Sequence, residues 1–125
     1  MEIRCNSRKG GSISRDMFSD NYRKPHFLVA KHKDQIIGSV CITEELFTID
    51  VFGLSWVGVH PSYTNKGIGT SMIRKALATI KSNANRPVTV ILATYPEKTR
   101  LYEKVGFKRC GKDHDGGSFM TYHIL

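Results

Sequence analysis

The sequence predicts an α/β (α+β) fold with a mixed, mostly antiparallel central sheet flanked by helices. Short apolar runs, several of them β-branched, lie at residues 27–30, 35–43, 52–59 and 88–93 and have the length and composition of strands. A segment of helical periodicity separates the last two runs, and a second helical segment and two further strand-like runs follow. The order strands, helix, strand, helix, strands indicates mixed pairing in one layer rather than a repeating βα barrel.

The first strands form a predicted hairpin. Residues 27–30 and 35–43 lie on either side of the polar sequence "KHKD", which we interpret as the turn. The next strand, "FGLSWVGV", should end before Pro61, because proline has no N–H to donate to a sheet. Upstream of the hairpin the chain is polar and weakly periodic, and we expect at most a short helix near residues 16–22.

Two helices and three strands are expected in the second half. The first helix has its apolar residues on one face, at Ile68, Met72, Ile73, Ala76, Leu77 and Ile80. The strand "VTVILA" is apolar throughout, which favours a central position in the sheet. Pro96 suits the first turn of a helix over residues 97–105, and Gly106 suits its C-terminal cap. Residues 107–110 and 118–125 then predict strands around the turn-prone "GKDHDGG".

Composition restricts the class of protein. The chain has 125 residues, of which 40% are hydrophobic and 24% charged, as expected for one globular domain. Its three cysteines are far apart in sequence, and no apolar run reaches membrane-spanning length, so we expect a cytoplasmic protein without membrane association. The formal charge of +8 favours an anionic partner. An arginine-rich recognition helix and RRM-type aromatic motifs are both missing from the sequence, which argues against nucleic acid as that partner.

The loop "TNKGIG" precedes the first helix and suits a phosphate. The first N–H groups of a helix have no partner within it, and the helix dipole favours an anion there. Gly67 and Gly69 would let this backbone approach a bulky anion, and Lys66 adds a positive charge. A Walker loop would need the lysine after the glycine, and a dinucleotide fingerprint would need a third glycine where Met72 stands.

Two segments together carry a resemblance to a family. The strand–loop–helix segment "VGVHPSYTNKGIGTSMIRKAL" and, some forty residues later, "LYEKVGF" resemble the two signatures of the GCN5-related N-acetyltransferases (GNAT), although Thr64 replaces the usual Gln or Arg. The similarity extends over residues 27–125. It implies a single domain over residues 1–125, with a shortened N-terminal helical region and a splayed strand pair that holds acetyl-CoA.

The resemblance also implies the site. The family transfers the acetyl group of acetyl-CoA to a primary amine by direct attack in a ternary complex, without a metal. By resemblance, Tyr102 is the general acid that protonates the leaving thiolate. The cofactor-binding residues would be Val57 and Val59, for the pantetheine arm, and Asn65, Lys66, Gly67, Ile68, Gly69 and Thr70, for the pyrophosphate.

Several questions stay open at the level of sequence. The general base could be His60, an upstream carboxylate (Glu44, Glu45 or Asp50) or a water relay. The acceptor could be a small molecule, a peptide N-terminus or a lysine. Tyr95 stands where the family often has an asparagine that contacts pantetheine. A non-catalytic acyl-CoA-binding or protein-interaction module is the alternative function, and the oligomeric state, a homodimer included, is not determined.

Overall fold

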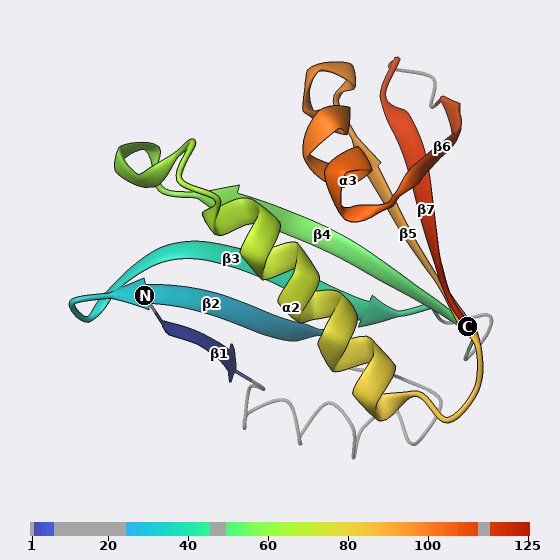
Figure 1. Ribbon diagram of the computed structural model, residues 1–125, viewed down its shortest axis with the longest axis horizontal. Helices are drawn as coiled ribbons and strands as arrows, with labels where there is room; N and C mark the ends of the chain where they lie inside the picture. Colours follow the sequence, from blue (N-terminus) through green and yellow to red (C-terminus); the bar gives the residue numbers. More distant parts are fainter. Residues whose placement is uncertain (1, 7–24, 46–49, 113–115) are drawn as a thin grey trace.

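The computed structural model describes residues 2–6, 25–45, 50–112 and 116–125. Within these residues, seven strands form one sheet in the order β1-β2-β3-β4-β5-β7-β6, and helices α2 and α3 lie against it (Figure 1). The β4–β5 pair is parallel and the other pairs are antiparallel, which confirms the predicted mixed, mostly antiparallel sheet. The helix predicted near residues 16–22 lies outside the described residues.

The first half of the sheet is an antiparallel meander of β1 (Glu2–Asn6), β2 (His26–His32), β3 (Gln35–Glu44) and β4 (Val51–Val59). The turn between β2 and β3 is Lys33–Asp34, with φ angles of 50° and 65°. Two residues at positive φ match the twist of the strands. Lys31 and His32, which the sequence placed in the turn, therefore extend β2. β1 was not predicted, because its short polar sequence carries no strong strand pattern and its pairing partner lies more than twenty residues away.

Helix α2 (Ile68–Asn83) follows the short 3₁₀ helix η2 (Pro61–Tyr63) and packs on β2, β3 and β4. All six apolar positions predicted to face the sheet are buried. The contact is close at Gly38, where a Cβ atom would lie 2.7 Å from the Met72 sulfur. Glycine at this position therefore lets the helix lie directly on β3. None of the helices in the described part of the chain is long and apolar enough to span a membrane.

The second half comprises β5 (Val88–Thr94), the 3₁₀ helix η3 (Pro96–Lys98), α3 (Thr99–Val105), β6 (Lys108–Lys112) and β7 (Ser118–Ile124). The helix predicted over residues 97–105 thus has a 3₁₀ first turn, in which the Thr99 hydroxyl donates to the Pro96 carbonyl at 3.0 Å. Gly106 ends α3 at a φ of 118°, as a C-terminal glycine cap does. Phe107, predicted to begin a strand, is instead 2% exposed in the core, and β6 begins one residue later.

Strands β4 and β5 separate along their length. They pair only from Val51–Thr89 to Gly53–Ile91, although they continue to Val59 and Thr94. Figure 1 shows the two strands starting together and diverging. The splayed pair expected from the resemblance is therefore present.

A bulge lies in the diverging part of β4. The register with β3 shifts between Ser39 and Cys41, and the facing residue Trp56 has a φ of 51°. A bulky residue in the left-handed region is strained, and such strain is common at functional sites. The Ser39 hydroxyl holds the bulge by donating to the Trp56 carbonyl at 3.1 Å.

Candidate active site

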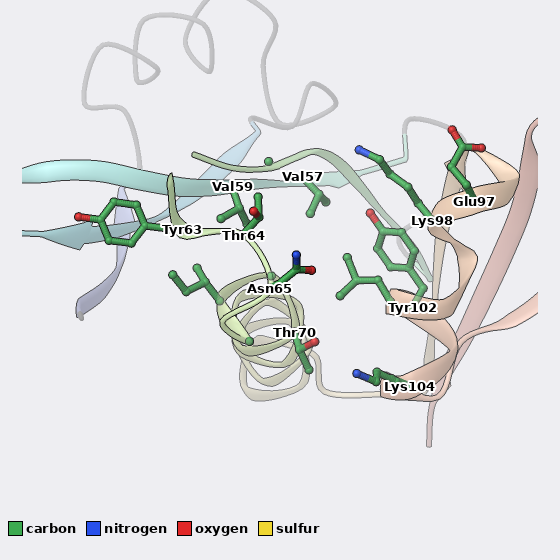
Figure 2. A pocket seen from close by; sticks show the side chains of 15 residues that line it. Val57, Val59, Tyr63, Thr64, Asn65, Thr70, Glu97, Lys98, Tyr102 and Lys104 are labelled. Carbon is green, nitrogen blue, oxygen red and sulfur yellow. The ribbon is translucent and has the colours of Figure 1, made fainter. Parts of the chain in front are cut away.

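A cavity of about 540 Å³ lies between β4, the loop before α2, and the η3–α3 segment. Figure 2 shows Val57 and Val59 on one wall and Tyr102 on another, with Asn65 and Thr70 on the side where α2 begins. The lining residues are Val57, Gly58, Val59, Tyr63, Thr64, Asn65, Gly67, Ile68, Gly69, Thr70, Glu97, Lys98, Leu101, Tyr102 and Lys104. The cavity thus brings together every residue named from the sequence as catalytic or cofactor-binding except Lys66.

The floor of the cavity is the N-terminus of α2. Gly67 is its N-cap, at a φ of 80°, and no side chain caps the helix. The first helical bond in this turn runs from the Ser71 N–H to the Gly67 carbonyl at 3.0 Å. The N–H groups before Ser71 therefore have no acceptor within the helix, and the first turn contains no acidic residue. Such an end attracts an anion.

The two glycines of the loop have different roles. A Cβ on Gly67 would meet nothing within 4 Å, but the positive φ disfavours any other residue. A Cβ on Gly69 would lie 3.6 Å from Leu101 and 3.7 Å from Val59, which is ordinary contact. The sequence argument assigned both glycines to the same close approach. In the structure, Gly67 is needed for the backbone conformation, whereas Gly69 has room for a methyl group.

Two basic residues of the loop region point elsewhere. The Lys66 ammonium lies over the Tyr63 ring, 5.6 Å from its centroid, and its side chain does not line the cavity. Nδ1 of His60 accepts a hydrogen bond from the Ser62 N–H at 3.1 Å and so caps η2. His60 therefore has a capping role here and is not among the lining residues.

The positive charge at the cavity comes from the wall that η3 and α3 form. Lys98 and Lys104, on η3 and α3, line it together with Glu97 (Figure 2). Local sequence patterns gave only a weak signal for these lysines, since they lie 29 and 35 residues after Gly69, the end of the glycine loop. Tyr95, at the position of the family's asparagine, is 67% exposed and does not line the cavity.

Tyr102 is the titratable side chain buried deepest in the cavity wall. It is 6% exposed and packs edge-on against Phe107 at a centroid distance of 5.9 Å. Burial raises the pKa of its phenol, and a hydrogen bond with the Thr94 side chain partly offsets this. The phenol is therefore protonated at neutral pH and able to donate a proton.

Partly buried hydrogen bonds anchor the helix that carries Tyr102. The Thr99 hydroxyl, on a side chain 2% exposed, donates to Pro96 and accepts from the Arg109 guanidinium at 2.8 Å. Arg109 also contacts the Glu103 carboxylate at 3.3 Å. These bonds tie the start of α3 to β6 and hold the phenol facing β4.

Comparison with known proteins identifies one family over most of the chain. Residues 23–109 match the model of a family described as acetyltransferase (GNAT) domain. No curated protein matches the sequence.

Solved structures resemble the whole chain. An aminoglycoside 6′-acetyltransferase type Ii has 18% identity and a TM-score of 0.76, with 100% of this chain and 98% of that chain covered. A Bacillus subtilis acetyltransferase in complex with CoA has 15% identity and a TM-score of 0.75, with 99% of both chains covered. An IAA acetyltransferase from Bacillus cereus has 17% identity and a TM-score of 0.75, with 98% of this chain and 99% of that chain covered. Because these sequence identities are low, the similarity shows that the fold is shared and nothing further.

Proposed function

The chain belongs to the GNAT acetyltransferase family, and we propose that it transfers the acetyl group of acetyl-CoA to a primary amine by direct attack in a ternary complex. One observation carries the proposal: a single cavity contains an uncapped helix N-terminus, the edge of a splayed strand and a buried, protonated phenol. These three features match the three needs of the reaction, which are an anion site, a site for an extended arm and a proton donor. The CoA complex of the Bacillus subtilis acetyltransferase, which has the same fold, supports the choice of cofactor.

The residues of the cavity fit acetyl-CoA. The amides from Gly67 to Thr70 suit the pyrophosphate, and Lys104, which lines the same cavity, can add positive charge. Beyond Gly53, β4 no longer pairs with β5, so the backbone around Val57 and Val59 can bond to the pantetheine arm. When bound, acetyl-CoA supplies an acetyl thioester, which is activated toward attack by an amine.

Tyr102 has the properties of the general acid. The Tyr102 side chain lines the cavity and faces Val57. Burial keeps the proton on its phenol at neutral pH. We assign it the proton that the leaving sulfur requires. The bond with the Thr94 side chain orients the hydroxyl.

Direct attack is favoured over an acetylated enzyme. Of the cysteines whose side chains the structure describes, Cys41 is buried and Cys110 is exposed on β6, and neither lines the cavity. Among the residues that the structure describes, the cavity lining thus offers no thiol to carry the acetyl group.

Two measurements test the proposal. Thermal shift with CoA should raise the melting temperature, because a ligand that binds only the folded state stabilises it. Release of CoA from acetyl-CoA should then be followed with N-acetyl-lysinamide, a short peptide with a free N-terminus, spermidine and tyramine. We expect turnover with at least one amine and intersecting initial-rate plots, as a ternary complex requires. Parallel plots would indicate an acetyl-enzyme, and CoA binding without turnover of any amine would favour the non-catalytic module.

A further inference from the structure

We propose that a groove between α2 and the end of β7 binds an extended, acidic segment of another protein, which adds a strand to β7. The groove has a volume of about 480 Å³ and shares no lining residue with the cofactor cavity. The inference adds an interaction surface to the molecule and does not depend on the acetyl transfer proposed above.

The groove follows the strand β7 itself. Residues 122–125 all line it, although the side chains of consecutive strand residues point to opposite faces of a sheet. The groove therefore borders the edge of the strand and not one face of it alone.

The edge of β7 is open at this end. β5 pairs with β7 from Ser118 to Ile124, whereas β6 pairs with it only as far as Thr121. Figure 1 accordingly shows β6 beside the upper part of β7. Within the described part of the chain, residues 122–124 thus have a strand partner on one side only. Their backbone groups on the other side can pair with an added strand.

The floor of the groove is apolar and fixed in position. Leu77 of α2, Val105 at the end of α3 and Ile124 of β7 line it and are 7%, 9% and 8% exposed. All three belong to the hydrophobic core, so their side chains cannot turn away. An apolar side chain of the added strand would lose contact with water on this floor, which favours binding.

The rim of the groove is cationic. Arg74 and Lys81 of α2 line it on one side, and none of the described residues that line the groove is acidic. The whole of α2, Ile68–Asn83, contains no acidic residue. Neither Arg74 nor Lys81 forms an ion pair with another of the described residues. An acidic segment would therefore meet two cations whose charge is not compensated.

The spacing of the two cations predicts a sequence pattern in the partner. Arg74 and Lys81 are two helical turns apart on the same side of α2, which is about 10 Å along the axis. In an extended peptide, residues i and i+4 share a face and lie about 13 Å apart, a difference that the long Arg and Lys side chains can span. Residue i+2 lies between them and faces the apolar floor. The expected pattern is acidic–x–apolar–x–acidic.

Two other occupants fit the groove less well. A second copy of this chain would bring the same cationic helix and a formal charge of +8, so the two copies would repel each other. A nucleic acid would neutralise Arg74 and Lys81, but its backbone cannot pair with the strand edge at residues 122–124. An acidic peptide satisfies the cations, the apolar floor and the open edge together.

The test measures fluorescence polarisation of the fluorescein-labelled peptide STDTLTDTS with the full chain. We expect saturable, micromolar binding, as is usual for a small interface. The double variant Arg74→Glu, Lys81→Glu should weaken this binding at least ~10-fold, because it replaces attraction by repulsion. Lys75→Glu, on the same helix but outside the groove, should bind the peptide as wild type does. CoA binding should be equal in all three proteins and serves as the control for folding, since none of these residues lines the cofactor cavity.

Two altered peptides test the floor and the strand edge. Replacing the leucine by serine, or placing N-methyl groups on alternate backbone nitrogens, should each abolish binding, because the first removes the apolar contact and the second the N–H donors. Equal affinity of the wild type and the double variant, or undiminished binding of the N-methylated peptide, would overturn the proposal. So would tighter binding of a thymine oligonucleotide than of the peptide, or a dimer of wild type in sedimentation that the double variant does not form.

Discussion

Replacing Tyr102 by phenylalanine isolates the proton donor from the ring that carries it. The edge-on contact with Phe107 and the burial of the ring are retained in Tyr102→Phe. The variant loses the hydroxyl and its bond with the Thr94 side chain. Loss of one such bond should lower the free energy of unfolding by about 0.5–1.5 kcal/mol. If the phenol protonates the leaving sulfur, the rate of acetyl transfer should fall by roughly 10²–10⁴-fold.

The pKa shift of Tyr102 adds a second observable. Burial raises the pKa of the phenol, so the folded state holds this proton more tightly than the unfolded chain. This contribution to the free energy of unfolding is fully present below about pH 10, the ordinary pKa of tyrosine. It is lost as the pH rises through the higher pKa of the folded state. Tyr102→Phe has no such group, so its stability should fall less steeply above that pH. Its rate should likewise lose the alkaline decline that ionisation of the acid causes.

The assay is a single turnover of acetyl-CoA at saturating amine, with a thermal melt on the same preparation. A single turnover times the chemical step even if product release limits kcat. Tyr122→Phe is the matched control, because Tyr122 packs on Phe107 at 5.3 Å and does not line the cavity. A folded Tyr102→Phe variant that transfers acetyl within about threefold of the wild-type rate would refute the general-acid role.

Three further predictions concern the loop, the charge and the bulge. Gly67→Asp should nearly abolish CoA binding in calorimetry, since it places a carboxylate at the anion site and strains a φ of 80°. Gly69→Ala should bind CoA within a few-fold of wild type, and equal affinities for wild type and both variants would contradict the pyrophosphate assignment. Lys104→Glu should weaken CoA binding roughly 10-fold and reduce its dependence on salt, and an unchanged salt dependence would indicate that Lys104 does not meet the phosphates. Trp56 is 77% exposed and has a φ of 51°. Trp56→Gly should keep the wild-type melting temperature, because relief of about 1–2 kcal/mol of backbone strain offsets the added freedom of the unfolded chain. Trp56→Ala keeps the strain and should melt at a lower temperature than Trp56→Gly.

Features that depend on neighbouring residues were predictable from the sequence. The buried face of α2 follows from the spacing of its apolar residues, and the free amides after Gly67 follow from the place where that helix starts. Tyr102 could be named from the sequence because it lies within a short, contiguous signature, and the structure places it in the cavity wall. In each case the residues that create the feature lie within one helix or one short segment, so they are close together in the chain.

Features that depend on strand register needed the tertiary structure. Nothing local in the sequence indicated that the Glu45 carboxylate lies over Gly53, because this position depends on how β3 pairs with β4. Lys66 was expected at the phosphate site from its place beside Gly67, yet its side chain turns to the Tyr63 ring. Pairing between strands joins residues that are distant in sequence, and a shift of one residue would turn each side chain to the other face. For this reason the sequence alone determined the uncapped start of α2 and the short segment that carries Tyr102, while the register of the sheet decided which side chains lie where β4 and β5 part.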